Sequence, residues 1–389
     1  MSRLLIAALV ALWCLPAPAR AAEPYEIQVI LPLTGGGAFA GKGQQDNLSA
    51  LEAVMNKEGG IDGRPVKFVF VDDQTSPQVA VQLASDIVAK HPAVFLGSSL
   101  VAMCNAIAPL TKNGPVQYCM SPGFHPPAGS FGFSVSSSSY DQMLTVVRYY
   151  HLKGWNKIAV LTPTDATGQD AEKALAQILA LPEFKEVQRV ESQHFNTSDV
   201  SVAAQMERIK GSGAQAVIAW TTGTPLATVL KAAIQAGLDV PITPSSGNQT
   251  FAQMAQYESF LPAGFLLPSA IFPEHEGVLQ LDPRVEKAQH DMYAILKERG
   301  IRADNMSATS WDAGLIVVGA LRKLGPSATD AQLRDYIANL TDFAGVGGIY
   351  NFKENTERGL GANSATIVRY DGKNKAWVWM AKPGGEPLK

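Results

Sequence analysis

The stretch IQVILPLTGGGAFAGKGQ, residues 27–44, sets the architecture of the chain. Its first part, IQVILPL, is an apolar run interrupted only by Gln28, which is typical of a strand that is buried on both faces. A glycine-rich turn follows, and then an amphipathic helix that places Leu48, Leu51, Val54 and Met55 on one face. The stretch therefore predicts a strand–loop–helix unit of a parallel α/β sheet.

The glycines of this stretch have the spacing of a phosphate-binding loop. Gly36, Gly41 and Lys42 match the pattern G-x-x-x-x-G-K. Gly43, however, stands where that motif requires the Ser or Thr hydroxyl that ligates Mg²⁺. The sequence therefore does not predict a nucleotide site. Two interpretations stay open, a plain tight turn or a backbone receptor for an anion at a helix N-terminus.

Apolar strand signals alternate with helical ones along most of the chain. Strands are predicted at 66–73, 93–97, 115–121, 157–163, 187–195, 216–223, 241–246 and 264–269. Helices are predicted at 77–90, 101–112, 140–152, 168–180, 199–211, 225–236, 283–299, 307–324 and 329–340. This repeated β-α-β order predicts parallel sheets with helices on both faces.

A serine-rich break divides this alternation into two halves. FGFSVSSSSYDQ, residues 131–142, is predicted to be the first crossing between two lobes, and residues 347–380 are antiparallel in character, with a turn at Asp371–Gly372. We therefore predict an α/β fold of two doubly wound parallel-sheet lobes joined by a multi-strand hinge. The predicted bounds are residues 23–137 plus 270–346 for lobe 1, and residues 138–269 plus 347–389 for lobe 2.

The first 22 residues have the layout of a secretory signal peptide. A basic start, MSR, precedes the apolar run LLIAALVALWCL and the A-x-A site in PAPARA, so cleavage is expected after Ala21 or Ala22. Lipid attachment at Cys14 is disfavoured, because Trp13 occupies a position that this processing reserves for a small residue. The mature chain is predicted to be exported to the periplasm.

Composition and cysteine content exclude several kinds of partner. The formal net charge is -3 and the sequence pI is about 6.1, which argues against a nucleic-acid or polyanion partner. Cys104 and Cys119 are the only cysteines of the mature chain. They could form a disulfide in an oxidising compartment or remain two buried thiols. Without nearby histidines they make a poor zinc site, and we predict neither a metal nor a cofactor.

The sequence offers little support for catalysis. It contains no G-x-S-x-G nucleophile elbow and no H-E-x-x-H zinc motif. Asp72 and Asp73 follow a predicted strand, where a turn or capping role is favoured over an active-site role. We therefore predict that the protein is not an enzyme.

Small polar and aromatic residues gather where predicted strands end. Five such loops are GSSLVA (97–102), SPGFH (121–125), TPTDATG (162–168), WTTG (220–223) and SSGNQ (245–249). In open α/β sheets the ligand binds outside the carboxyl ends of the strands. These loops could line one cleft between the lobes, although ordinary connectors have a similar composition.

The chain resembles the type I periplasmic solute-binding proteins of the leucine/isoleucine/valine-binding class. The resemblance rests on the strand and TG-glycine loop of residues 27–44, on NKEGGIDGRP (56–65) and on DDQTSP (72–77). It extends through SATSWDAGLIVVGAL (307–321) and GVGGIYNF (345–352), and so spans nearly the whole mature chain. The resemblance implies a Venus-flytrap fold that delivers a small molecule to an inner-membrane ABC permease. A monomer is expected.

The resemblance also implies ligand-binding positions. It places Phe39 or Ala40 above the ligand and Ser99 at the start of a carboxylate-binding loop, while His125 replaces a Thr of the family and Thr167 an aromatic residue. The predicted ligand-binding residues are Phe39, Ser99, Leu100, Val101, Ala102, Ser121, Gly123, Phe124, His125, Thr167, Trp220, Thr222, Ser246 and Asn248.

One departure from the family pattern bears on the ligand. Amino-acid binders of the family place an acid after the strand at 241–246 to receive the ligand's ammonium group, and this chain has Ser246 there. A buried ammonium group without a carboxylate partner is costly. We therefore expect a carboxylate ligand that lacks an amino group, with Phe39, Phe124 and Trp220 as apolar walls.

Other functions stay open. An ordinary branched-chain amino-acid binder could use another acid, for example Asp165, for the ammonium group. A periplasmic sensor subunit is a further alternative, and a hydrolase is the least supported one.

Overall fold

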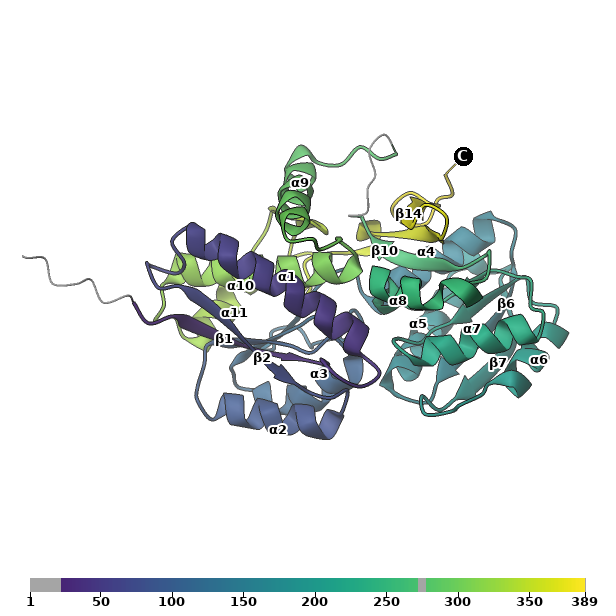
Figure 1. The fold of residues 1–389 in the computed structure, drawn as a ribbon, viewed down its shortest axis with the longest axis horizontal. Coiled ribbons are helices and arrows are strands. Elements are labelled where there is room, and N and C mark those ends of the chain that lie inside the picture. The colour runs from purple at the N-terminus through teal and green to yellow at the C-terminus, as the bar shows by residue number, and fades with distance from the viewer. Residues whose placement is uncertain (1–21, 272–277, 389) are drawn as a thin grey trace, which may run out of the picture.

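The computed structural model describes residues 22–271 and 278–388, which form two lobes side by side (Figure 1). The predicted signal peptide, with Cys14, falls almost entirely on residues 1–21, outside the described residues. Within the described part of the chain, no helix is both long and apolar enough to cross a membrane.

The first lobe is built on a parallel sheet with strand order β2-β1-β3-β4-β5. Its strands are β1 (Tyr25–Leu31), β2 (Val66–Asp72), β3 (Val94–Gly97), β4 (Val116–Cys119) and β5 (Gly132–Ser134). Along β1, Ile27, Val29 and Leu31 point into the main core of the lobe, while Ile30 packs on the opposite face. Both faces are covered, which explains why nearly every residue of this strand after Glu26 is apolar.

Helices from both ends of the chain cover this sheet (Figure 1). They are α1 (Ala38–Lys57), α2 (Pro77–Val88), α3 (Val101–Ile107), α10 (Asn305–Leu324) and α11 (Asp330–Ala338), while α9 (Pro283–Glu298) packs on α1. Helix α2 packs against α3, and α1 packs against α10. A short antiparallel pair, β11 (Phe343–Gly345) and β12 (Gly348–Tyr350), completes the lobe.

A buried carboxylate attaches this pair to α10. Asp312 accepts hydrogen bonds from the backbone N–H groups of Val346 (2.8 Å) and Gly347 (2.9 Å) and from the Tyr350 hydroxyl (2.8 Å). Burial raises the pKa of Asp312 to about 6, against these three hydrogen bonds, which favour the carboxylate. The contact holds the returning C-terminal part of the chain in the first lobe.

The second lobe repeats the design with a parallel sheet of strand order β7-β6-β8-β9. Its strands are β6 (Lys157–Pro163), β7 (Gln188–Phe195), β8 (Ala216–Ala219) and β9 (Ile242–Thr243). Its helices are α4 (Ser139–Leu152), α5 (Ala166–Leu179), α6 (Ala203–Gly211), α7 (Pro225–Gln235) and α8 (Phe251–Tyr257). The predicted α/β class with two parallel-sheet lobes is confirmed.

Antiparallel strands lie at the junction between the lobes. Strand β10 (Leu266–Ala270) pairs with β13 (Ala365–Asp371), which pairs in turn with β14 (Ala376–Trp379). The turn predicted at Asp371–Gly372 is where β13 ends. Tyr350, Phe352 and Leu360, which the predicted bounds give to lobe 2, pack in the core of the first lobe.

Other predicted bounds differ for local reasons. The helix predicted at 199–211 begins only at Ala203, because Asn196 and Asp199 bond to each other's backbone and Ser201 accepts from Ala203 N–H. The helix predicted at 101–112 gives way to a 3₁₀ turn over Ala108–Thr111. Cys104 of α3 and Cys119 of β4 form a disulfide with a Cα–Cα distance of 6.2 Å.

Candidate ligand-binding site

A pocket lies between the lobes where strands of both parallel sheets end. Its empty volume is about 420 Å³, part of which is open solvent. The first lobe contributes the loops that follow β3 and β4, and the second contributes those that follow β6, β8 and β9. The first turn of α4, directly after the first crossing, also reaches the pocket.

Many of the residues predicted from the sequence line this pocket. They are Ser99, Leu100, Val101, Ser121, Gly123, Thr167, Trp220, Thr222 and Ser246. Sequence reasoning missed Pro122, Ser139, Gln142, Asp170, Ser245 and Gly247. Ser139 and Gln142 could have been found as the helical start after the serine-rich crossing, whereas Asp170 lies one turn into α5 and carries no signal of its own.

The remaining predicted residues lie outside the lining. Phe124 packs on the disulfide of Cys104 and Cys119, and Ala102, in the first turn of α3, packs against the small core between α2 and α3. Asn248 is fully buried, donates to the Thr221 carbonyl (2.6 Å) and accepts from Gly223 N–H (2.9 Å). Its role is to hold the 221–223 loop in shape.

Phe39 contacts the other lobe, and it is absent from the lining. Its ring meets that of Tyr257 edge-on, with ring centroids 6.3 Å apart. The neighbouring glycine loop also docks on the second lobe, because Thr224 N–H donates to the Gly36 carbonyl (3.1 Å). A Cβ on Gly223 would lie 2.1 Å from the Gly36 oxygen, so the approach requires glycine. We refer to Gly36, Phe39, Gly223, Thr224 and Tyr257 as the glycine edge.

The phosphate-loop spacing has a packing explanation. A Cβ on Gly41 would lie 2.2 Å from the Pro32 carbonyl oxygen, so glycine lets α1 start close to the end of β1. In the second lobe, a Cβ on Gly168 of α5 would likewise lie 1.7 Å from the carbonyl oxygen of Pro163, the last residue of β6. Lys42 is exposed. These glycines serve the packing of a helix on the preceding strand.

The pocket hydroxyls are already ordered by neighbours. Ser99 donates to the side-chain oxygen of Gln44, and the hydroxyls of Thr222 and Ser245 are 2.6 Å apart. The Ser246 carbonyl accepts from the Asn305 side chain of the first lobe (3.2 Å). These contacts present several hydroxyls to the pocket in fixed positions, which suits binding of a polar group.

A buried carboxylate lies beside this contact. Asp304 caps α10 by accepting from Met306 N–H (2.9 Å), and it also accepts from the backbone N–H of Phe251 in the second lobe. Burial raises the pKa of Asp304 to about 7. Asp304 therefore ties the two lobes behind the pocket.

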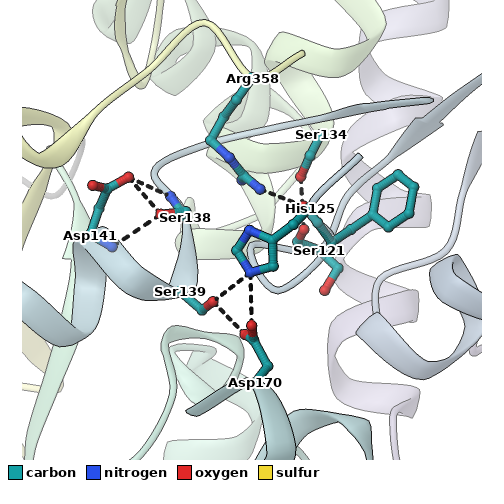
Figure 2. A network of polar contacts seen from close by, with 9 residues as sticks. Ser121, His125, Ser134, Ser138, Ser139, Asp141, Asp170 and Arg358 are labelled. Carbon is teal, nitrogen blue, oxygen red and sulfur yellow. Dashed lines mark hydrogen bonds and ion pairs between the residues drawn. The ribbon is translucent and has the colours of Figure 1, made fainter. Parts of the chain in front are cut away.

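The lining contains a single carboxylate among the described residues, that of Asp170. Its Oδ1 lies 2.8 Å from Nε2 of His125, and Ser139 donates to its Oδ2 (Figure 2). His125 Nε2 is also 3.2 Å from the Ser139 hydroxyl. We refer to His125, Ser139 and Asp170 as the histidine edge. Asp165, by contrast, is the N-cap of α5 and lies outside the lining. It was the acid suggested from the sequence as an alternative partner for a ligand's ammonium group, and it does not line the pocket.

A buried arginine supports the loop that carries His125. Arg358 donates to the carbonyl oxygens of Phe124, Val135 (3.2 Å) and Ser136 (3.3 Å). Burial lowers the pKa of Arg358 to about 10, so the guanidinium is charged at neutral pH. Figure 2 shows the Arg358 side chain above His125, reaching toward the loop that carries this histidine. Within the described residues, no cluster of His, Cys, Asp or Glu could hold a metal ion.

A family model described as periplasmic binding protein matches residues 24–375. The chain belongs to the type I periplasmic binding protein family. Such proteins are periplasmic or extracellular receptors for solutes. A search of curated proteins finds no match for this periplasmic binding protein.

Solved structures share its fold. An extracellular ligand-binding receptor from Rhodopseudomonas palustris HaA2 is 21% identical, with a TM-score of 0.79 over 92% of this chain and 99% of that one. The branched-chain amino acid transporter substrate binding protein LivJ from Streptococcus pneumoniae, in complex with isoleucine, is 17% identical, with a TM-score of 0.76 over 94% and 100%. The leucine binding protein LivK from Thermotoga maritima is 18% identical, with a TM-score of 0.77 over 92% and 97%.

Proposed function

We propose that this periplasmic binding protein is the solute-binding component of an ABC importer and takes a small organic acid without an amino group. The observation that carries the proposal is the chemistry of the lining. Ser246 lines the pocket at the position where the family resemblance implies an acid for the ligand's amino group, and Asp170 has both oxygens engaged by His125 and Ser139.

The first-lobe side of the pocket suits a carboxylate. Ser99 and Ser121 bring hydroxyls, and Gly123 leaves its backbone accessible. No Lys or Arg is among the described residues of the lining, so the acid would be held by hydroxyls and N–H groups. Leu100, Val101 and Trp220 supply apolar surface, which favours a hydrophobic or aromatic body for the ligand.

Binding is proposed to act through closure. A solute that contacts both lobes favours the form in which the lobes are close together, and closure excludes water from the pocket. The closed outer surface is then what an inner-membrane permease recognises.

One observation favours a second candidate, a branched-chain amino-acid receptor. Asp170 is a carboxylate in the lining, and an ammonium group could displace His125 from it. The likeness to LivJ and LivK is one of fold, so the binding of a branched-chain amino acid by this chain is a proposal. The two candidates differ in whether the ligand carries a positively charged ammonium group that pairs with Asp170.

A matched pair of solutes separates these candidates. Leucine and 4-methyl-2-oxopentanoate share the side chain and the carboxylate and differ in that an oxo group replaces the α-amino group, and benzoate adds an aromatic acid. Calorimetric titration of the mature protein should give binding of the oxo acid or benzoate and no heat with leucine. Tight leucine binding, lost in Asp170→Asn, would establish the amino-acid receptor and overturn the proposal.

A further inference from the structure

His125 and Asp170 come from opposite lobes and meet at the rim of the pocket (Figure 2). His125 lies in the loop after β4 of the first lobe, and Asp170 lies on α5 of the second. Among the described residues, this is the one ion pair within 4.0 Å that joins the lobes, because each of the others lies within a single lobe. Its formation therefore depends on how closely the lobes approach.

The pair is held in place from both sides. Arg358 bonds to the Phe124 carbonyl, directly before His125, and so anchors the loop to the first crossing. Ser139, at the start of α4, donates to Asp170 and lies beside the imidazole. The Asp170 side chain is only 14% exposed, whereas that of His125 is 45% exposed. The carboxylate is thus shielded, and the imidazole can exchange protons with solvent.

The charged groups around His125 are few. On α4, Asp141 is turned toward Ser138 in a capping box, and on α5, Glu172 pairs with Arg189. Helix α3 carries no ionisable side chain apart from the bonded Cys104. Three charged groups remain: the Asp170 carboxylate lies against the imidazole, the buried Glu357 carboxylate accepts from Gly129 N–H in the same loop, and the Arg358 guanidinium bonds to the Phe124 carbonyl.

We infer that His125 and Asp170 form a pH-sensitive latch between the lobes, which favours the closed form when His125 is protonated. The inference rests on the proposed function only in that the lobes open and close around a solute. Ser139 is a positioning residue, since it orients the carboxylate toward the imidazole.

The sign of the effect follows from the charges of the pair. In the closed form a protonated His125 lies 2.8 Å from the Asp170 carboxylate, and opening of the lobes separates the two charges, so the attraction favours closure. The closed fraction is therefore expected to be higher at pH 5.5 than at pH 8.0. At pH 5.5 the solution is still above the range in which carboxylates ordinarily titrate.

The test needs no solute. Gln82→Cys on α2 and Glu207→Cys on α6 place one dye on an exposed position of each lobe, and both native cysteines of the mature chain are bonded to each other. Single-molecule energy transfer then reports the closed-to-open ratio at pH 5.5 and pH 8.0. We expect this ratio to be about two- to fivefold higher at pH 5.5, a modest change because the imidazole is half exposed.

Three variants in the labelled protein decide the outcome. His125→Gln and Asp170→Asn should each make the change with pH smaller, whereas His290→Gln, an exposed histidine on α9, should leave it as in the unaltered protein. Asp304, the other carboxylate bonded across the lobes, is present in all of these proteins and cancels in the comparison. An unchanged pH response in both His125→Gln and Asp170→Asn would overturn the latch.

The latch and the proposed function fail separately. Calorimetry that finds no acid bound, together with a pH response lost in His125→Gln, would leave the latch and remove the proposed ligand class. Acid binding without any pH response of the distance between the lobes would support the proposed ligand class and remove the latch.

Discussion

The two edges of the pocket bring the lobes together by different means. At the glycine edge, a backbone hydrogen bond from Thr224 to Gly36 and the ring contact of Phe39 with Tyr257 carry no ionisable group at neutral pH. At the histidine edge, an imidazole meets a carboxylate. The glycine edge depends on a close fit between the lobes and should not respond to pH, whereas the histidine edge can respond to pH. A receptor that closes on a solute can use one edge for fit and the other for control.

The largest expected effect concerns the stability of the first lobe, which carries one side of each edge. Asp312→Ala leaves Val346 N–H, Gly347 N–H and the Tyr350 hydroxyl without their acceptor in the first lobe. We expect the free energy of unfolding to fall by about 3 kcal/mol in urea titrations, because buried donors would lose their partners. Asp46→Ala, an exposed carboxylate on α1, is the control, with a change of about 0.5 kcal/mol or less. Equal unfolding midpoints for the two variants would contradict this.

The next largest effect tests the close approach of the lobes at the glycine edge, apart from the backbone strain of replacing a glycine. Gly223→Ala would place a Cβ 2.1 Å from the Gly36 oxygen, so the lobes cannot approach as they do here. We expect solute affinity to fall on the order of tenfold in calorimetry. Gly213→Ala has a similar positive φ, +70° against +83°, but its Cβ meets nothing within 4 Å. It shares the conformational cost and should keep its affinity. If both variants bound alike, the close approach would not matter.

The ring contact should have a smaller effect. Phe39→Ala removes the edge-to-face pair with Tyr257, and such pairs contribute about 0.5–1.5 kcal/mol beyond their buried area. We expect affinity to fall about three- to tenfold, with little change in the free energy of unfolding. Phe343→Ala removes a similar pair with Tyr350 inside the first lobe. It should show the opposite pattern, a loss of stability with affinity retained.

The smallest effect is expected from salt, which should weaken the histidine edge more than the glycine edge. An exposed ion pair is screened by salt, whereas a backbone hydrogen bond and a ring contact are affected little. Raising NaCl from about 0.1 M to about 1 M shortens the Debye length from about 10 Å to about 3 Å. The difference in closed fraction between pH 5.5 and 8.0 should therefore shrink in the labelled protein. A pH response that is independent of salt would point to a buried group such as Asp304.

The fold and the loops of the pocket could be predicted because each depends on local patterns. The apolar run at residues 27–31 and the turn residues after each strand predict parallel strands and their carboxyl ends. What could not be predicted depends on the approach of two lobes. Phe39 was expected above the ligand and lies on Tyr257, since the sequence does not encode the distance between the lobes directly.

Polar residues were hard to assign for a related reason. Asn248 was predicted to face the ligand, but the backbone groups of Thr221 and Gly223 use its amide. Asp170 was missed because a single acid in an amphipathic helix has the same pattern whether it faces solvent or a pocket. Only the tertiary structure places it opposite His125.

The central claim is that the pocket between the lobes holds an organic acid that lacks an amino group. The most direct measurement is mass spectrometry of the small molecule released on denaturing protein that was purified from the periplasm without added solute. The account predicts a carboxylic acid without an amino nitrogen, bound at about one per chain. Recovery of leucine, isoleucine, valine or another amino acid at that ratio would contradict it.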